Sequence, residues 1–153
     1  MVVEFIFDLL PGNEPPYEYA PGHVTITTDQ GTGSSRPDRH FMVAVSLLDL
    51  LSVLKAFLLH GKMTGFTWSV IDTSFSVYFQ RVTRRLKGQE KPIRIVCGSQ
   101  DLGAVAEQEL KQAILDGTRH FLRTYAGKLG DEEAELAAAT EEFAAAFGLE
   151  ECL

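Results

Sequence analysis

The residues that could carry out chemistry are few and scattered along the chain. The four histidines are His23, His40, His60 and His120. No two of them are three or four residues apart, so one helix face cannot present a pair to a metal ion. The two cysteines, Cys97 and Cys152, form no C-x-x-C pair, and no G-x-S-x-G nucleophile turn is present. We therefore expect no catalytic residue, no cofactor and no metal.

One glycine-rich stretch, Gly-Thr-Gly-Ser-Ser-Arg at residues 31–36, has the composition of a phosphate-binding loop. It lacks the Lys-Ser/Thr ending of a P-loop, and Pro37 follows where a helix would begin. We interpret residues 30–39 as a flexible hairpin loop. Cys97 lies in an apolar run and is expected to be a buried free thiol.

The best candidate for a functional segment is the loop PGNEPPYEYAPG at residues 11–22, which holds four of the six prolines. Prolines restrict a loop, so ordering it against a partner costs less entropy. Tyrosines anchor interfaces and carboxylates steer basic partners. The alternative is that Tyr17 and Tyr19 fold back over the sheet edge. The expected partner-binding residues are Glu14, Tyr17, Glu18, Tyr19, Asp29, Asp38 and Asp72.

Charge divides the sequence into three parts. The formal net charge is −7, made of −4 over residues 1–61, +4 over residues 62–101 and −7 over residues 102–153. The negative total disfavours nucleic acid and anionic membranes as partners and favours a basic protein. Arg81, Arg84 and Arg85 in the basic middle either pair with the acidic helices or bind an anion. We favour internal pairing because the overall charge repels phosphate.

The length of 153 residues suits a single domain, here residues 1–153, that can bury a core without disulfides. The longest apolar stretch, residues 47–59, is interrupted by Asp49, Ser52 and Lys55. It is shorter than the roughly 20 residues of a membrane-spanning helix. We expect a cytoplasmic protein with no membrane partner.

The first half of the chain reads as three strands and a helix. Residues 2–8 are rich in β-forming residues, with Val3, Phe5 and Phe7 on one face, which predicts a strand. Residues 23–29 alternate apolar and polar side chains, which predicts a half-buried strand, and residues 41–45 predict a third. Ser46 and Asp49 fit the start of a helix as an S-x-x-D capping box. Leucines and Phe57 then form an apolar stripe that ends at Gly61.

The second half predicts three more strands and two helices. Residues 65–71 and 75–79 alternate around the turn 72–74, which predicts an antiparallel hairpin with Trp68 in the core; a solvent-facing, partner-binding tryptophan is the alternative. Residues 93–97 give a sixth strand. Asp101 is expected to cap a long helix that ends at Gly130, with Gly117 at a close packing contact or a bend. The acids from Asp131 onward open a last, alanine-rich helix.

The predicted order is therefore βββαβββαα. Short turns between strands favour a six-stranded, mainly antiparallel sheet, with the three helices largely on one face. The expected fold class is α+β.

The layout of two segments suggests a family. FMVAVSLLDLLSVLKAFLLHG (residues 41–61) joins a strand to a helix, and GFTWSVIDTSFSVYF (residues 65–79) is the tryptophan-bearing hairpin. Together with the acidic character, this layout resembles the immunity proteins of bacterial polymorphic toxin systems. The resemblance implies a stoichiometric inhibitor whose acidic surface covers the active site of a basic toxin, often a nuclease. It identifies no individual functional residue.

Two other functions fit the same sequence. One is a small-ligand-binding protein or enzyme with a pocket between sheet and helices, using Asp72, His40 or Arg94. The other is a structural homodimer that pairs its alanine-rich last helix, so monomer and homodimer both stay open.

Overall fold

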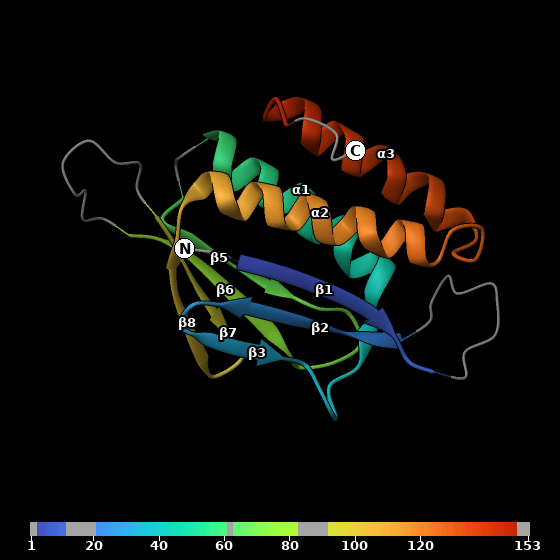
Figure 1. The fold of residues 1–153 in the computed structure, drawn as a ribbon, viewed down its shortest axis with the longest axis horizontal. Coiled ribbons are helices and arrows are strands. Elements are labelled where there is room, and N and C mark those ends of the chain that lie inside the picture. The colour runs from blue at the N-terminus through green and yellow to red at the C-terminus, as the bar shows by residue number, and fades with distance from the viewer. Residues whose placement is uncertain (1–2, 12–20, 61–62, 83–91, 150–153) are drawn as a thin grey trace.

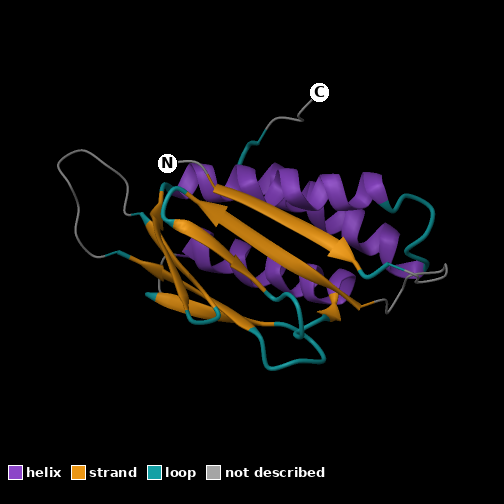
Figure 2. Ribbon diagram, turned by 60° about the horizontal axis from the view of Figure 1, so that its bottom comes forward, coloured by secondary structure: helices purple, strands orange, loops and turns teal. Residues whose placement is uncertain are grey.

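The computed structural model describes residues 3–11, 21–60, 63–82 and 92–149. Within these residues the chain forms two layers, with the helices gathered on one side of the strands (Figures 1 and 2). The elements, in order, are β1 (Val3–Leu9), β2 (Pro21–Thr28), β3 (Gly31–Ser34), β4 (Phe41–Met42), α1 (Val43–His60), β5 (Gly65–Ser69), β6 (Ser76–Arg81), β7 (Ile93–Cys97), β8 (Gln100–Val105), α2 (Glu107–Thr124) and α3 (Asp131–Ala146). The predicted α+β class with three helices is confirmed for the described residues.

In the described residues the strands form two antiparallel sheets of four strands each, so the expected single six-stranded sheet is wrong. The first sheet has the order β1-β2-β3, with β4 pairing to the start of β2; the second has the order β5-β6-β7-β8. The sheets meet where β3 lies against β7 and β8. A Cβ added to Gly33 would lie 2.6 Å from the Cβ of Cys97, and the Thr28 hydroxyl donates to the Leu102 carbonyl over 2.6 Å.

The two strands that the sequence pattern misses, β3 and β8, both contain glycine. β3 lies inside the stretch expected to be a flexible loop, and β8 contains Asp101, which was expected to cap a helix. Asp101 instead accepts a hydrogen bond from the Arg94 side chain across the β7–β8 pair. Gly103 of β8 has φ +79°, and the β7–β8 pairing shifts register between Arg94 and Val96. Because of this irregularity, β8 does not show the alternation of apolar and polar residues that predicts a strand.

The start of α1 differs from the expected capping box. The strand predicted at residues 41–45 ends at Met42, and α1 begins at Val43, three residues before Ser46. Ser46 is fully buried inside the helix, where its hydroxyl oxygen accepts the Ile71 amide hydrogen over 3.0 Å. The side chain thus ties the helix to the β5–β6 turn.

The apolar faces predicted for the strands form the core. Val3, Phe5 and Phe7 of β1 are buried, as are Val24 and Ile26 of β2. The expected core position of Trp68 is confirmed, since it is 1% exposed and its indole N–H donates to the Ser46 carbonyl over 2.9 Å. Cys97 is a buried free thiol, also as expected.

α1 is the one helix of the described residues that is long and apolar enough to span a membrane by length and composition. Half of that 18-residue window is buried in the protein, where the helix packs against both sheets and α3. Core helices commonly have this composition.

α2 lies along the edge of β1 and runs in the same direction (Figure 1). Near the start of the contact, a Cβ at Gly117 would lie 2.6 Å from the Phe5 carbonyl oxygen, so the expected close packing at Gly117 is confirmed. Near its end, the Leu9 amide donates to the Tyr125 hydroxyl over 3.0 Å. α2 ends at Thr124, before the predicted Gly130, and α3 packs on α1 and α2.

Candidate functional site

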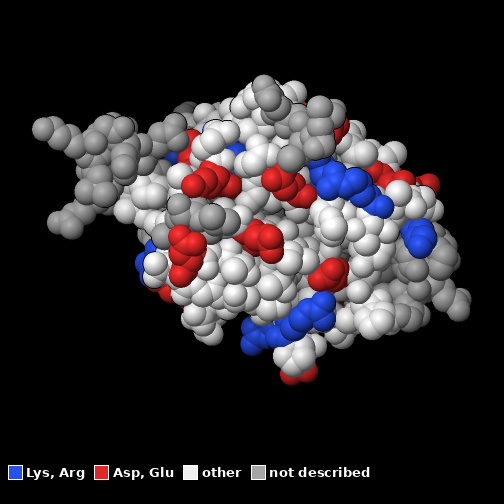
Figure 3. Space-filling view, viewed as in Figure 1, with Lys and Arg blue, Asp and Glu red and all other residues white. Residues whose placement is uncertain are grey.

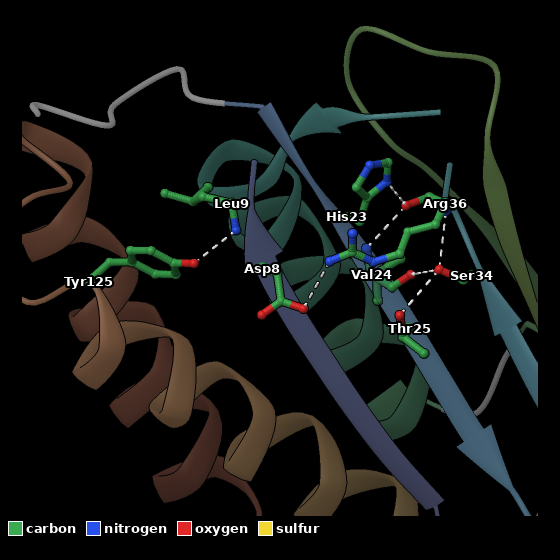
Figure 4. Close-up of polar contacts among 9 residues, drawn as sticks. Asp8, Leu9, His23, Val24, Thr25, Ser34, Arg36 and Tyr125 are labelled. Carbon is green, nitrogen blue, oxygen red and sulfur yellow. Dashed lines mark hydrogen bonds and ion pairs between the residues drawn. The ribbon is translucent and has the colours of Figure 1, made fainter. Parts of the chain in front are cut away.

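Several loops of the described structure gather at one end of the fold. β4 brings Met42 beside Pro21, and the Met42 amide donates to the Ile71 carbonyl over 3.1 Å. Residues 35–40 (the 35–40 loop) lead into β4, while residues 71–74 (the 71–74 turn) join β5 to β6. Polar and charged side chains from β1 and β2 also point here (Figure 4).

A buried histidine anchors the 35–40 loop to β2. His23 is 2% exposed, and its Nδ1 lies 2.8 Å from Oγ of Ser35, which is 1% exposed. The Ser35 oxygen also accepts the Val24 amide hydrogen over 3.1 Å. Burial lowers the pKa of His23, as do the nearby Arg36 and His40 to smaller degrees. The neutral imidazole and the occupied, buried hydroxyl hold the loop; they do not present an accessible nucleophile.

The next residues of the loop extend this network. The Arg36 guanidinium forms an exposed ion pair with Asp8 of β1 over 3.4 Å. The Ser34 hydroxyl accepts the Arg36 amide hydrogen and donates to the Val24 carbonyl, both over 3.1 Å (Figure 4). Loop, β1 and β2 are thus joined by side chains that no local sequence motif predicts.

The 71–74 turn presents an apolar side chain on a fixed backbone. Ile71 donates its amide hydrogen to Ser46 Oγ and accepts the Met42 amide hydrogen, yet its side chain is 39% exposed. The next residue, Asp72, is exposed and has φ 86°, a left-handed conformation that non-glycine residues seldom adopt. Backbone outliers of this kind are concentrated at functional sites.

A polar hollow of about 390 Å³ lies between the 35–40 loop, the β7–β8 turn and Phe75, which follows the 71–74 turn. Asp38 and Arg39 line it. Among the described lining residues, Phe75 is the one that adjoins the 71–74 turn.

Two of the expected partner-binding residues lie in the loops at this end of the fold. Asp38 of the 35–40 loop and Asp72 of the 71–74 turn are exposed at this end of the fold. Asp29 is exposed in the β2–β3 turn, which lies at the opposite end of β3 from Asp38. The other four, Glu14, Tyr17, Glu18 and Tyr19, lie outside the described residues, although the flanking Leu10 and Pro21 pair at this same end.

The basic middle of the chain contributes internal contacts where it is described. Arg81 pairs with Glu107 of α2 over 3.3 Å, donates to the Phe57 and Leu58 carbonyls at the end of α1, and stacks on the Phe57 ring. Internal pairing is thus confirmed for Arg81; Arg84 and Arg85 lie outside the described residues.

The residues suggested for an enzyme or ligand pocket occupy different places. Arg94 lies at the Gln80 end of β6 and pairs with Asp101, whereas Asp72 precedes the opposite end of that strand. The His40 ring lies edge-on to His23, with 6.4 Å between ring centroids. In the described part of the chain, no three His, Cys, Asp or Glu side chains cluster in a way that could hold a metal ion.

A second hollow, which we call the β1–α2 groove, has a volume of about 470 Å³. Its apolar lining comes from Val3, Phe5, Ile6, Ala113 and Gly117, and its charged lining from Glu4, Asp116, Arg119, His120 and Arg123. No local pattern of residues points to this groove, because its two walls are separated by more than 100 residues.

Acidic and basic side chains are interspersed over the face that carries β1 and α2 (Figure 3). No protein-family model, curated protein or solved structure matches the chain.

Proposed function

We propose that the protein is a non-catalytic binding module that neutralises a basic toxin, in the manner of an immunity protein. The 71–74 turn and the 35–40 loop form its docking surface in this proposal. The observation that carries it is the fixed, exposed Ile71 beside the exposed Asp72.

Ile71 has the properties of an interface anchor. Both of its backbone hydrogen-bonding groups are already satisfied inside the protein, so a partner does not need to order this position. The exposed apolar side chain can enter a pocket on the partner. Preorganised apolar anchors at the centre of an interface carry a large share of binding energy.

Charge supplies the preference for a basic partner. Asp38 lines the polar hollow, Asp72 is exposed in the 71–74 turn, Asp8 pairs with Arg36, and the whole chain carries −7. Such a field accelerates association with a cationic surface and loses this effect at high salt.

The test uses the basic product of the reading frame next to this one, co-expressed with the protein in a growth-rescue assay. Rescue of growth and a 1:1 complex are expected. Ile71→Ala should weaken binding about tenfold or more, with the loss in dissociation rate. Asp38→Asn and Asp72→Asn should slow association and flatten its salt dependence.

Matched controls come from residues of the same kinds elsewhere. Leu59→Ala removes a side chain that is 49% exposed at the opposite end of α1, and Glu142→Gln neutralises an exposed acid of α3. Both should bind as the wild type does. A neighbouring toxin that is neutralised equally by Ile71→Ala and by the controls would refute this docking surface, and failure to neutralise any basic neighbour would refute the function.

A further inference from the structure

The charged residues of the β1–α2 groove are arranged by sign along its length. Phe5 of β1 touches Gly117, and Leu9 bonds to Tyr125, so strand and helix advance together. Glu4 therefore lies at the level of the helix turn that contains Asp116. His120 and Arg123 follow one and two turns further along α2, and one turn is about 5.4 Å. The groove thus has an acidic end and a basic end.

Its charges are only partly neutralised within the protein. Arg119 pairs with Glu141 over 3.2 Å, and Asp116 accepts a hydrogen bond from Gln112 over 2.9 Å. Across the described residues, neither Glu4 nor Arg123 forms an ion pair, although both line the groove. Two unpaired opposite charges therefore remain on the two walls, above an apolar floor that includes Phe5, Ile6 and Ala113.

We propose that the β1–α2 groove binds a free α-amino acid with a large apolar side chain. The ammonium group lies at the end formed by Glu4 and Asp116, the carboxylate lies at the end formed by His120 and Arg123, and the side chain covers the apolar floor. A volume of about 470 Å³ lies in the range of small-molecule sites, roughly 300–1,000 Å³. This site is separate from the proposed docking surface.

The geometry argues against the other common occupant of a strand edge, an added peptide strand. Strand addition needs an open row of backbone groups along the edge. Gly117 lies directly against the Phe5 carbonyl, and Tyr125 occupies the Leu9 amide, so α2 closes the edge at two points. A compact ligand held by the side chains that line the groove needs no open row of backbone groups.

Four probes that share one phenyl group separate the contributions of the two charges. They are L-phenylalanine, 3-phenylpropanoate without the ammonium, phenethylamine without the carboxylate, and N-acetyl-phenylalanine amide without either charge. Each is titrated into the ¹⁵N-labelled full chain, and the amide shifts of Gly117 and Phe5 are followed. Phenylalanine should bind best, and loss of one charge should weaken binding about two- to fivefold, as expected for exposed ion pairs.

Variants assign each charge to a wall. Arg123→Gln should abolish the preference for phenylalanine over phenethylamine, and Glu4→Gln should abolish its preference over 3-phenylpropanoate. Lys128→Gln and Glu142→Gln, exposed charges outside the groove, should change neither preference. All these positions are exposed, and unchanged amide spectra without ligand verify the fold.

Two results would overturn the site. Equal binding of all four probes would show an apolar surface without charge recognition. Absence of saturable shifts at Gly117 and Phe5 up to the solubility limit of phenylalanine would show no site at all. Neither result bears on toxin neutralisation, which is measured separately.

Discussion

Replacing Gly117 by alanine has two effects of opposite sign on the stability of the protein. In an exposed helix interior, Gly→Ala stabilises by about 1 kcal/mol because alanine has the higher helix propensity. At Gly117 the new Cβ would lie 2.6 Å from the Phe5 carbonyl oxygen and 3.1 Å from the Phe5 Cβ, where ordinary contacts begin at 3.4 Å. The nearest atom belongs to a strand backbone that is paired with β2, so it yields less easily than a side chain.

The net effect follows from the relative sizes. Overpacking a rigid site costs about 3 kcal/mol at the upper end of its usual range, which exceeds the propensity gain. We expect Gly117→Ala to lower the free energy of unfolding by about 2 kcal/mol, or Tm by about 4–8 °C in a chain of this length. The loss of stability arises where α2 meets β1. In an NMR spectrum of the variant, the amide resonance of Phe5 should therefore shift among the most.

Thermal and urea unfolding monitored by circular dichroism measure the change. Ala138→Gly, at an exposed position of α3, calibrates the propensity effect in the same protein and should cost about 1 kcal/mol. If Gly117→Ala raised Tm while Ala138→Gly lowered it, propensity would dominate, and the close approach of α2 to β1 would be refuted.

Three further perturbations test the buried polar contacts. Because burial lowers the pKa of His23 in the fold, the unfolded chain binds more protons, and stability should fall as pH drops below 6.5; His23→Gln should reduce the difference between urea midpoints at pH 7.5 and 5.5, and an unchanged difference would contradict this role. Arg81→Met should cost about 2 kcal/mol, since it removes the Glu107 pair and two helix-end hydrogen bonds; a wild-type urea midpoint would show that these contacts contribute nothing. Burial raises the pKa of Cys97 to about 11, so a disulfide reagent at pH 8 should label this thiol only at the rate of unfolding; labelling within seconds in native buffer, with Cys152 replaced by serine, would show that it is accessible.

The parts of the fold that the sequence predicts are those set by local periodicity. The strand faces around Phe5 and Ile26, the apolar stripe of α1 and the hairpin around Trp68 all repeat at strand or helix spacing. Such periods depend on which side of one element is buried. The same periodicity is therefore found whichever part of the protein the element packs against.

The parts that escape prediction depend on contacts between distant residues. Gly33 pairs with Ile26 of β2 and lies where β3 approaches Cys97 closely, and nothing in the neighbouring residues signals either contact. Ser46 resembles a helix cap, but its hydroxyl serves Ile71 instead. Asp38 and Asp72 were expected from charge alone, whereas the exposed, fixed Ile71 beside Asp72 appears only once the 71–74 turn is placed against α1 and β4.

Because α2 covers the edge of β1, this edge stays uncovered during synthesis until α2 has been made. The Leu9 amide and the Tyr125 hydroxyl that meet at the end of this contact are 116 residues apart. At about 5–20 residues per second, a ribosome needs roughly 6–23 s to make the chain between them. Throughout that interval the edge of β1 has no helix against it, and an uncovered strand edge can pair with other chains. A truncated chain that stops before α2 should therefore aggregate, although it already contains both sheets.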